Sequence, residues 1–198
     1  MADSNDPPDE TLMAGIVAGD REAFAALYRR RRADVFRFAL LMSGSTAVAD
    51  DVAQDVFMEV IRRAHRYQPG RSGVVPWLIG IARNHVLRSR HQQRLVTPVD
   101  QVDNSPALVV VTDPLAGIAR QQHVATLRRA VCLLPAKYRE AIVLCDLQAM
   151  TYADAAASLG CAIGTVRSRL HRARAMLAAR LSQSDAALWR PPLARWMP

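Results

Sequence analysis

The stretch that decides the fold runs over Thr151–Arg174 and reads TYADAAASLGCAIGTVRSRLHRAR. Its first residue and Asp154 form a capping box, which predicts the start of a helix. Three alanines allow a second helix to cross closely, and Gly160 supplies the turn. Val166 and Leu170 then give the next helix one apolar face. This pattern is typical of a helix-turn-helix, whose second helix enters the major groove of DNA.

The second helix of this motif has a strongly basic outer side, with no acidic residue between Gly164 and Arg180. A helical hairpin with a solvated basic face is the alternative interpretation. The cap, the small residues, the turn glycine and the basic helix occur together, and this combination favours DNA binding. The positions expected to contact duplex DNA are Thr165, Arg167, Ser168, Arg169, His171 and Arg172.

No segment shows the period of two that a strand requires, so the sequence predicts an all-α fold. Apolar spacing predicts helices over about 21–42, 46–66, 74–91, 115–133, 135–147, 151–159 and 164–181. We expect two small helical domains joined by a flexible linker, because residues 95–114 carry three prolines and no helical period. The expected divisions are an acidic extension 1–20, domains at 21–94 and 115–182, the linker 95–114 and a tail 183–198.

The chain has 26 Lys and Arg against 18 Asp and Glu, a formal net charge of +8. This balance favours a polyanionic partner, either nucleic acid or an anionic membrane surface. No signal peptide and no stretch of membrane-spanning length is present, so we expect a cytoplasmic protein with no membrane insertion. The three cysteines (Cys132, Cys145 and Cys161) lack metal-ligand spacing, so no metal and no cofactor is expected.

Charge is distributed unevenly along the first domain. Four acidic residues bracket Gln54 on one helix, whereas residues 61–99 contain eight arginines and no acid. Solvated acidic and basic faces are the simplest explanation, and acids early in a helix also suit its dipole. However, so many uncompensated arginines repel one another, and a phosphate backbone relieves that repulsion. The basic stretch therefore favours nucleic-acid contact.

Aromatic and amide side chains accompany these arginines. Tyr67, Gln68 and Asn84 surround a glycine-containing turn, and unpaired bases are bound by stacking and by hydrogen bonds to their edges. Trp77 lies on the apolar side of its predicted helix, so a place in the core is favoured for it.

Three further strings resemble the sigma-70 family of RNA polymerase sigma factors, in its extracytoplasmic-function (ECF) group. ADDVAQDVFMEV resembles the polymerase-binding helix of sigma region 2, and VPWLIGIARNHVLRSR resembles the helix that reads the −10 promoter element. LPAKYREAIVLCDLQAMTYADAAASLGCAIGTVRSRLHRAR resembles sigma region 4. The resemblance covers about residues 21–181.

The resemblance implies a transcription initiation factor with no catalytic residues. Its partners would be core RNA polymerase, through the clamp helices and the flap, promoter DNA, and an anti-sigma factor. The residues implied in polymerase binding are Asp50, Asp51, Gln54 and Asp55. Those implied at the −10 element are Tyr67, Gln68, Arg71, Asn84 and Arg88, and the helix-turn-helix residues named above would read the −35 element.

Three other functions remain open at this point. A helix-turn-helix regulator that acts without polymerase would leave the acidic helix unexplained. An enzyme is disfavoured, because the five histidines are scattered and no glycine-rich phosphate loop occurs. An inactive antagonist of another sigma factor also remains. Finally, we expect the two basic domains not to associate, which would leave a groove between them for an acidic anti-sigma helix.

Overall fold

A computed structural model of the protein describes residues 6–70, 72–96 and 118–184, and these residues contain helices and connections only. In chain order the elements are α1 (Asp9–Val17), α2 (Arg21–Ser43), α3 (Thr46–Arg63), η1 (Ala64–Arg66), α4 (Val74–Val96), α5 (Ile118–Cys132), α6 (Ala136–Ile142), η3 (Val143–Leu147), α7 (Tyr152–Leu159) and α8 (Ile163–Ser184). The all-α prediction is confirmed for this part of the chain. None of its helices has the length and apolar composition needed to cross a membrane. The expected linker and tail lie almost entirely outside the described residues.

Helices α1 to α4 with η1 form an N-terminal bundle. Local chemistry fixes its helix ends: the Asp20 carboxylate accepts hydrogen bonds from the N–H groups of Glu22 and Ala23, and Gly44 ends α2 in the left-handed conformation at φ 79°. The core is made by the apolar faces of α2, α3 and α4. Phe38, Val56 and Leu78 are almost fully buried there, and burial of each contributes about 1.5–3 kcal/mol.

Helix α1 was not predicted from the sequence, which was interpreted as an acidic extension up to residue 20. Leu12 and Met13 are buried against α2. The two helices cross closely because residue 15 is glycine: a Cβ atom there would lie 2.8 Å from the Ala23 Cβ. The N-terminal bundle therefore begins at Asp9 and not at Arg21.

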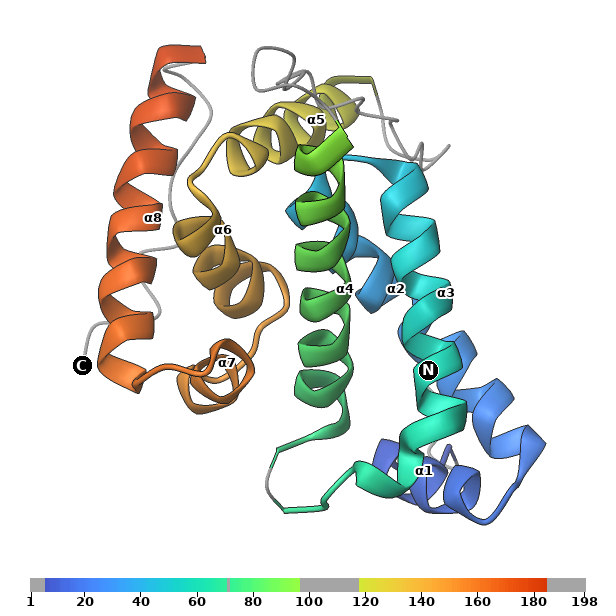
Figure 1. Ribbon diagram of the computed structural model, residues 1–198. Coiled ribbons are helices and arrows are strands. Elements are labelled where there is room, and N and C mark those ends of the chain that lie inside the picture. The colour runs from blue at the N-terminus through green and yellow to red at the C-terminus, as the bar shows by residue number, and fades with distance from the viewer. Residues whose placement is uncertain (1–5, 71, 97–117, 185–198) are drawn as a thin grey trace.

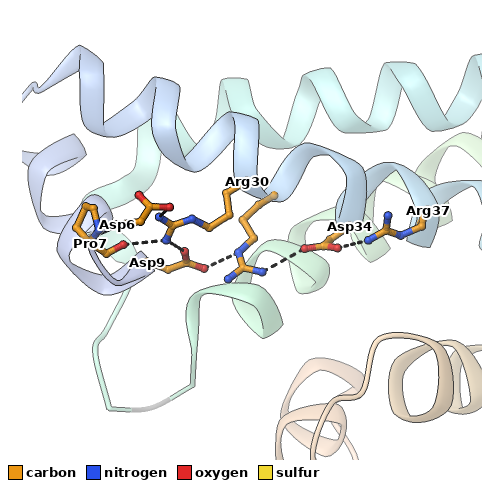
Figure 2. Close-up of polar contacts among 7 residues, drawn as sticks. Asp6, Pro7, Asp9, Arg30, Asp34 and Arg37 are labelled. Carbon is orange, nitrogen blue, oxygen red and sulfur yellow. Dashed lines mark hydrogen bonds and ion pairs between the residues drawn. The ribbon is translucent and has the colours of Figure 1, made fainter. Parts of the chain in front are cut away.

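An ion-pair network fastens α1 to α2 (Figure 2). The buried Asp9 carboxylate accepts hydrogen bonds from Arg30 Nη1 at 2.8 Å and from Arg31 Nε at 2.6 Å. Arg31 also reaches Asp34, which pairs in turn with Arg37. The network thus neutralises part of the arginine cluster of α2 with acids of the chain itself.

Helices α5 to α8 with η3 form a C-terminal bundle. Val166, Leu170 and Ala173 on the inner face of α8 are buried, as the sequence pattern predicts. The predicted helix 135–147 has two parts, because α6 widens into a π-helical turn at η3, where the Gln148 N–H donates to the Val143 carbonyl at 3.0 Å.

The two bundles pack directly on each other. Helix α4 stands between α2 and α3 on one side and the C-terminal bundle on the other (Figure 1), with contacts to α7, while α2 contacts α5, α6 and η3. Polar contacts that join the bundles are Arg83 Nε–Glu140 Oε1 (2.7 Å), Arg139 Nη1–Met42 O (2.8 Å), Gln148 Nε2–Asp34 O (3.0 Å), Ser158 Oγ–Pro76 O (3.3 Å) and Cys132 Sγ–Leu41 O (3.6 Å).

The expectation that the two basic domains do not associate is therefore wrong for the described residues. Net charge was a poor guide, because the arginines that bridge the bundles face hydrogen-bond acceptors, although Arg139 also lies near the like charge of Arg90 on α4. A carboxylate faces Arg83, and main-chain carbonyls face the Arg139 guanidinium. Local complementarity outweighs the repulsion between the two net charges, which solvent and salt screen.

We predict that Asp9→Ala lowers the free energy of unfolding by about 2 kcal/mol, because it removes charge-assisted hydrogen bonds at a buried carboxylate. Urea unfolding followed by circular dichroism measures this loss. Glu10→Ala, which removes an exposed acid from the same helix, is the control and should change stability by less than about 0.5 kcal/mol. Equal effects of the two substitutions would contradict the prediction.

Candidate polymerase and promoter interfaces

The acidic residues of α3 lie on its solvent side. Asp50, Asp51, Gln54 and Asp55 are all exposed, whereas Val52, Ala53, Val56, Phe57 and Val60 are buried. The predicted division of this helix into an apolar inner face and a polar outer face is confirmed. The outer face is free of any role in the core and so is available to a partner.

Neighbouring helices hold two of these acids in place. Asp50 pairs with Arg32 of α2 at 3.2 Å. Asp55 pairs with Nδ1 of His85 at 3.2 Å, and Nε2 of the same ring lies 3.0 Å from Glu59. Both ring nitrogens can donate only when the imidazole is protonated. His85 therefore connects α4 to the acidic face of α3, a connection that the sequence analysis missed.

Glu59 responds to this arrangement. Burial alone would raise the pKa of Glu59, but the hydrogen bond from His85 and the positive charges of Arg63, His85 and Arg88 outweigh it, so the pKa is lowered. Glu59 therefore stays ionised and keeps its contact with the His85 ring.

An open pocket of about 510 Å³ lies at the start of α4. It combines polar side chains, one indole and a glycine, which suits a flat, polar-edged group such as a nucleobase. Two of the lining residues come from α7 of the other bundle. The lining residues are Arg66, Gln68, Ser72, Pro76, Trp77, Gly80, Ile81, Asn84, Ala157 and Ser158.

Among the residues expected at the −10 element, Gln68, Asn84 and Arg88 are exposed, and the first two line the pocket. Arg71 lies outside the described residues. Arg66 also lines the pocket and was not singled out from the sequence. Arg66 belongs to the acid-free basic stretch. Its place two residues before Gln68 is the only feature of the sequence that could have identified it as a pocket residue.

Tyr67 has a different place from the one expected. Its side chain is buried, its hydroxyl donates to the Ser72 carbonyl at 3.1 Å, and its ring packs edge-on against Trp77 at 5.7 Å. This geometry favours a role in shaping the loop and orienting the indole over direct contact with a base. Trp77, expected in the core, is half-buried and forms part of the pocket wall.

The helix-turn-helix is formed by α7 and α8. The Thr151 hydroxyl oxygen accepts the Asp154 N–H at 3.1 Å, and Gly160 ends α7 at φ 61°. Both features agree with the predicted cap and turn. Behind the motif, Arg174 forms a two-point ion pair with Asp146, at 2.7 and 2.9 Å, which ties α8 to the end of η3.

The outer side of α8 presents most of the predicted DNA-contacting residues. Arg167, Ser168, His171 and Arg172 are exposed, and Thr165 and Arg169 are half-buried. Neighbouring rings orient two of the arginines. The Arg167 guanidinium lies 5.8 Å from the centre of the Tyr152 ring. Polar interaction with Arg172 lowers the pKa of the Tyr138 hydroxyl.

Comparisons with known proteins agree with this arrangement. Residues 27–95 match the model of sigma-70 region 2, and residues 125–177 match that of sigma-70 region 4. The chain is 33% identical to the ECF RNA polymerase sigma factor SigE of Mycolicibacterium smegmatis, over 87% of this chain and 68% of that protein. It is 36% identical to the ECF sigma factor SigM of Mycobacterium tuberculosis, over 86% and 83% respectively.

The solved structure of a relative has the same fold. The sigma factor RpoE of Bartonella quintana, crystallised with the anti-sigma factor NepR, superposes with a TM-score of 0.65 at 31% identity, covering 76% of this chain and 91% of that one. These matches define a promoter-recognition subunit of bacterial RNA polymerase. The chain belongs to the ECF group of the sigma-70 family, whose members direct core RNA polymerase to promoters.

We predict that Gly80→Leu abolishes promoter opening while the fold remains stable. A Cβ at residue 80 would meet open space, so the backbone accepts a side chain there and gains about 1 kcal/mol of helix propensity, yet the longer leucine side chain projects into the pocket and narrows it. Permanganate reactivity of thymines in the promoter bubble measures opening, and thermal melting measures stability. Gly80→Ala is the control and should retain opening. Normal opening by the leucine variant would rule out this pocket as the base site.

We predict that His85→Gln weakens core polymerase binding about two- to fivefold, whereas His85→Asn does not. The Asn amide nitrogen replaces Nδ1 and keeps the contact to Asp55, while the Gln amide nitrogen replaces Nε2 and keeps only the contact to Glu59. The modest size follows from the exposure of Asp55. Fluorescence anisotropy with core enzyme compares the two variants. Equal affinity of the two would show that the Asp55 contact does not matter.

Proposed function

We propose that this protein binds the clamp helices of core RNA polymerase through Asp50, Asp51, Gln54 and Asp55, and in the cytoplasm directs initiation at a specific set of promoters. In this proposal the pocket at the start of α4 captures an unpaired base of the −10 element. The exposed face of α8 reads the −35 element as duplex DNA, and the C-terminal bundle contacts the polymerase flap.

The observation that carries the proposal is the coexistence of three distinct surfaces on one small chain. The acidic face of α3 suits a basic protein partner, the pocket suits a single base, and the arginines of α8 suit the major groove. A DNA-binding regulator that acts without polymerase would use only the last of these. Capture of the flipped base repays part of the few kcal/mol that unpairing costs.

We further propose that an anti-sigma factor controls the protein, in a stress or envelope response. The support is the likeness to RpoE, which was solved in complex with the anti-sigma factor NepR. Because the two bundles are already in contact here, such a partner has to lie over the contact or separate it, and cannot simply fill a preformed groove between them.

The proposal is tested by transcription in a purified system with core polymerase and genomic fragments. Asp51→Arg combined with Gln54→Ala should abolish core binding without unfolding, because both residues are exposed and contribute little to stability. Arg167→Ala should cost about 1–3 kcal/mol of promoter binding, if the lost contact is bidentate to a base. Start-site mapping and circular dichroism provide the readouts.

A matched control distinguishes the recognition of specific bases from general electrostatic attraction to DNA. Arg29→Ala removes one exposed arginine from α2, far in sequence from both predicted DNA sites, and should change binding only through salt-dependent attraction. The proposal fails if the α3 double variant still co-purifies with polymerase at wild-type yield, or if Arg167→Ala leaves promoter choice unchanged.

A further inference from the structure

The arginines of α8 differ in what holds their side chains. Arg174 forms the two-point ion pair with Asp146, at 2.7 and 2.9 Å, and so serves the structure of its own bundle. Arg167 is exposed, and its Cζ lies 5.8 Å from the centre of the Tyr152 ring. In the described part of the chain, Arg169 has neither an acidic nor an aromatic partner. These arginines therefore enter a complex with DNA with different amounts of freedom.

Tyr152 is a rigid support, because the chain around it is fixed. It is the first residue of α7, and the residue before it caps that helix. The Thr151 hydroxyl oxygen accepts the Asp154 N–H at 3.1 Å, and the same hydroxyl donates to the Asp154 carboxylate at 2.7 Å. The Tyr152 ring is partly buried against the core, and a tyrosine has only two side-chain torsions to restrict. The ring that Arg167 contacts is thus fixed before any DNA binds.

A second arginine of α8 lies near the same ring. The hydrogen bond with Asp146 raises the pKa of the Arg174 guanidinium, and Tyr152 shifts it in the same direction. Arg167 and Arg174 are seven residues apart, which is about two helical turns, so both project from the same side of α8. Tyr152 therefore lies along the side of α8 from which Arg167 projects.

Contact with a base edge demands more of an arginine than attraction to a phosphate. A guanine accepts two parallel hydrogen bonds from one guanidinium, and this requires the planar group to lie in a set orientation. The attraction between a cation and the phosphate backbone is independent of sequence. A side chain that is ordered only on binding loses rotational freedom, which lowers affinity. An arginine that is already oriented in the free protein is therefore better suited to read a base.

The contact with Tyr152 can orient Arg167 without withholding it from DNA. A cation–π contact at an exposed site favours one arrangement by a factor of about two to five. Two hydrogen bonds to a base edge favour the correct base by a factor of about five to 150. The ring engages the face of the guanidinium, whereas a base engages the N–H groups at its edge, so one arginine can make both contacts at once.

We propose that Tyr152 is a positioning residue, which sets the base preference of α8 by orienting Arg167 before DNA binds. It acts through Arg167 and not through a base contact of its own. Arg169, which lacks such a support, contributes affinity that is independent of sequence. The proposal rests on the proposed function, because it assumes that α8 reads the −35 element.

The first test is NMR on the full-length chain, without polymerase or DNA. The ring current of Tyr152 should shift the side-chain signals of Arg167 upfield. Tyr152→Phe keeps an aromatic face and should keep this shift, whereas Tyr152→Leu keeps an apolar side chain and should lose it. Thermal melting checks that both variants are folded, and Tyr152→Met replaces the leucine variant should that one unfold. The same Arg167 shifts with and without an aromatic ring at residue 152 would overturn the proposal.

The second test measures base preference with core polymerase bound to the full-length chain, on a promoter fragment whose −35 positions are randomised. Arg167→Ala identifies the position that Arg167 reads. Tyr152→Leu should lower the preference at that position about two- to fivefold, and should add nothing in a chain that already carries Arg167→Ala. Tyr152→Phe should retain the wild-type preference. Tyr28→Leu is the matched control, because it removes an exposed tyrosine whose ring packs on Phe57 in the other bundle.

The pattern across positions separates positioning from a merely structural role. A general loss of stability would weaken binding to every sequence equally and leave the preferences unchanged. Unchanged preferences in Tyr152→Leu, or an effect that adds to that of Arg167→Ala, would overturn the proposal. The proposed function would then still stand, provided that Arg167→Ala itself relaxes one position. If Arg167→Ala relaxes none, the reading of the −35 element by Arg167 and the role of Tyr152 are both refuted.

Discussion

The structure depends on the several tasks that one helix, α4, performs at the same time. Four of its buried residues recur every four positions, at Val74, Leu78, Ala82 and Val86, and with Ile79 they form the buried side of the helix. An α-helix turns by about 100° per residue, so that buried stripe fixes the direction of every other side chain. Arg83, Asn84 and His85 follow one another in sequence and therefore reach the C-terminal bundle, the pocket and α3 respectively. A change that rotates α4 would disturb all three surfaces at once.

The arginines serve more purposes than their number suggests. A net charge of +8 indicates a polyanionic partner, yet several guanidinium groups are engaged within the chain. Arg30 and Arg31 hold α1, Arg139 and Arg83 join the bundles, and Arg174 ties α8 to η3. The arginine side chain suits both tasks, since its planar fork fits carboxylates and carbonyls as well as phosphate. Whether an arginine is available to contact DNA or instead holds two parts of the chain together depends on its position in the fold.

Much of the fold could be predicted from the sequence, because amphipathic spacing and caps are local signals. The helix-turn-helix, the acidic face of α3 and the exposed arginines of α8 all follow from such patterns. Helix α1 could not be predicted in this way, since nine residues form a stable helix only through tertiary contacts, here those of Asp9 with Arg30 and Arg31. The burial of Tyr67 and the packing of the two bundles were missed for the same reason: their partners are distant in sequence or belong to the main chain.

The chemical nature of the contacts between the bundles has an evolutionary consequence. In four of them, a side chain of the C-terminal bundle donates to a main-chain carbonyl of the N-terminal bundle, at Asp34, Leu41, Met42 and Pro76. Every residue type carries that carbonyl, so the acceptor survives substitution at those four positions. The N-terminal side of the contact is thus free to diverge, whereas the donors are constrained. In relatives that share this packing, residues on the two sides of the contact would show little covariation. In an alignment, the shared packing would be visible only because donors such as Arg139 are retained.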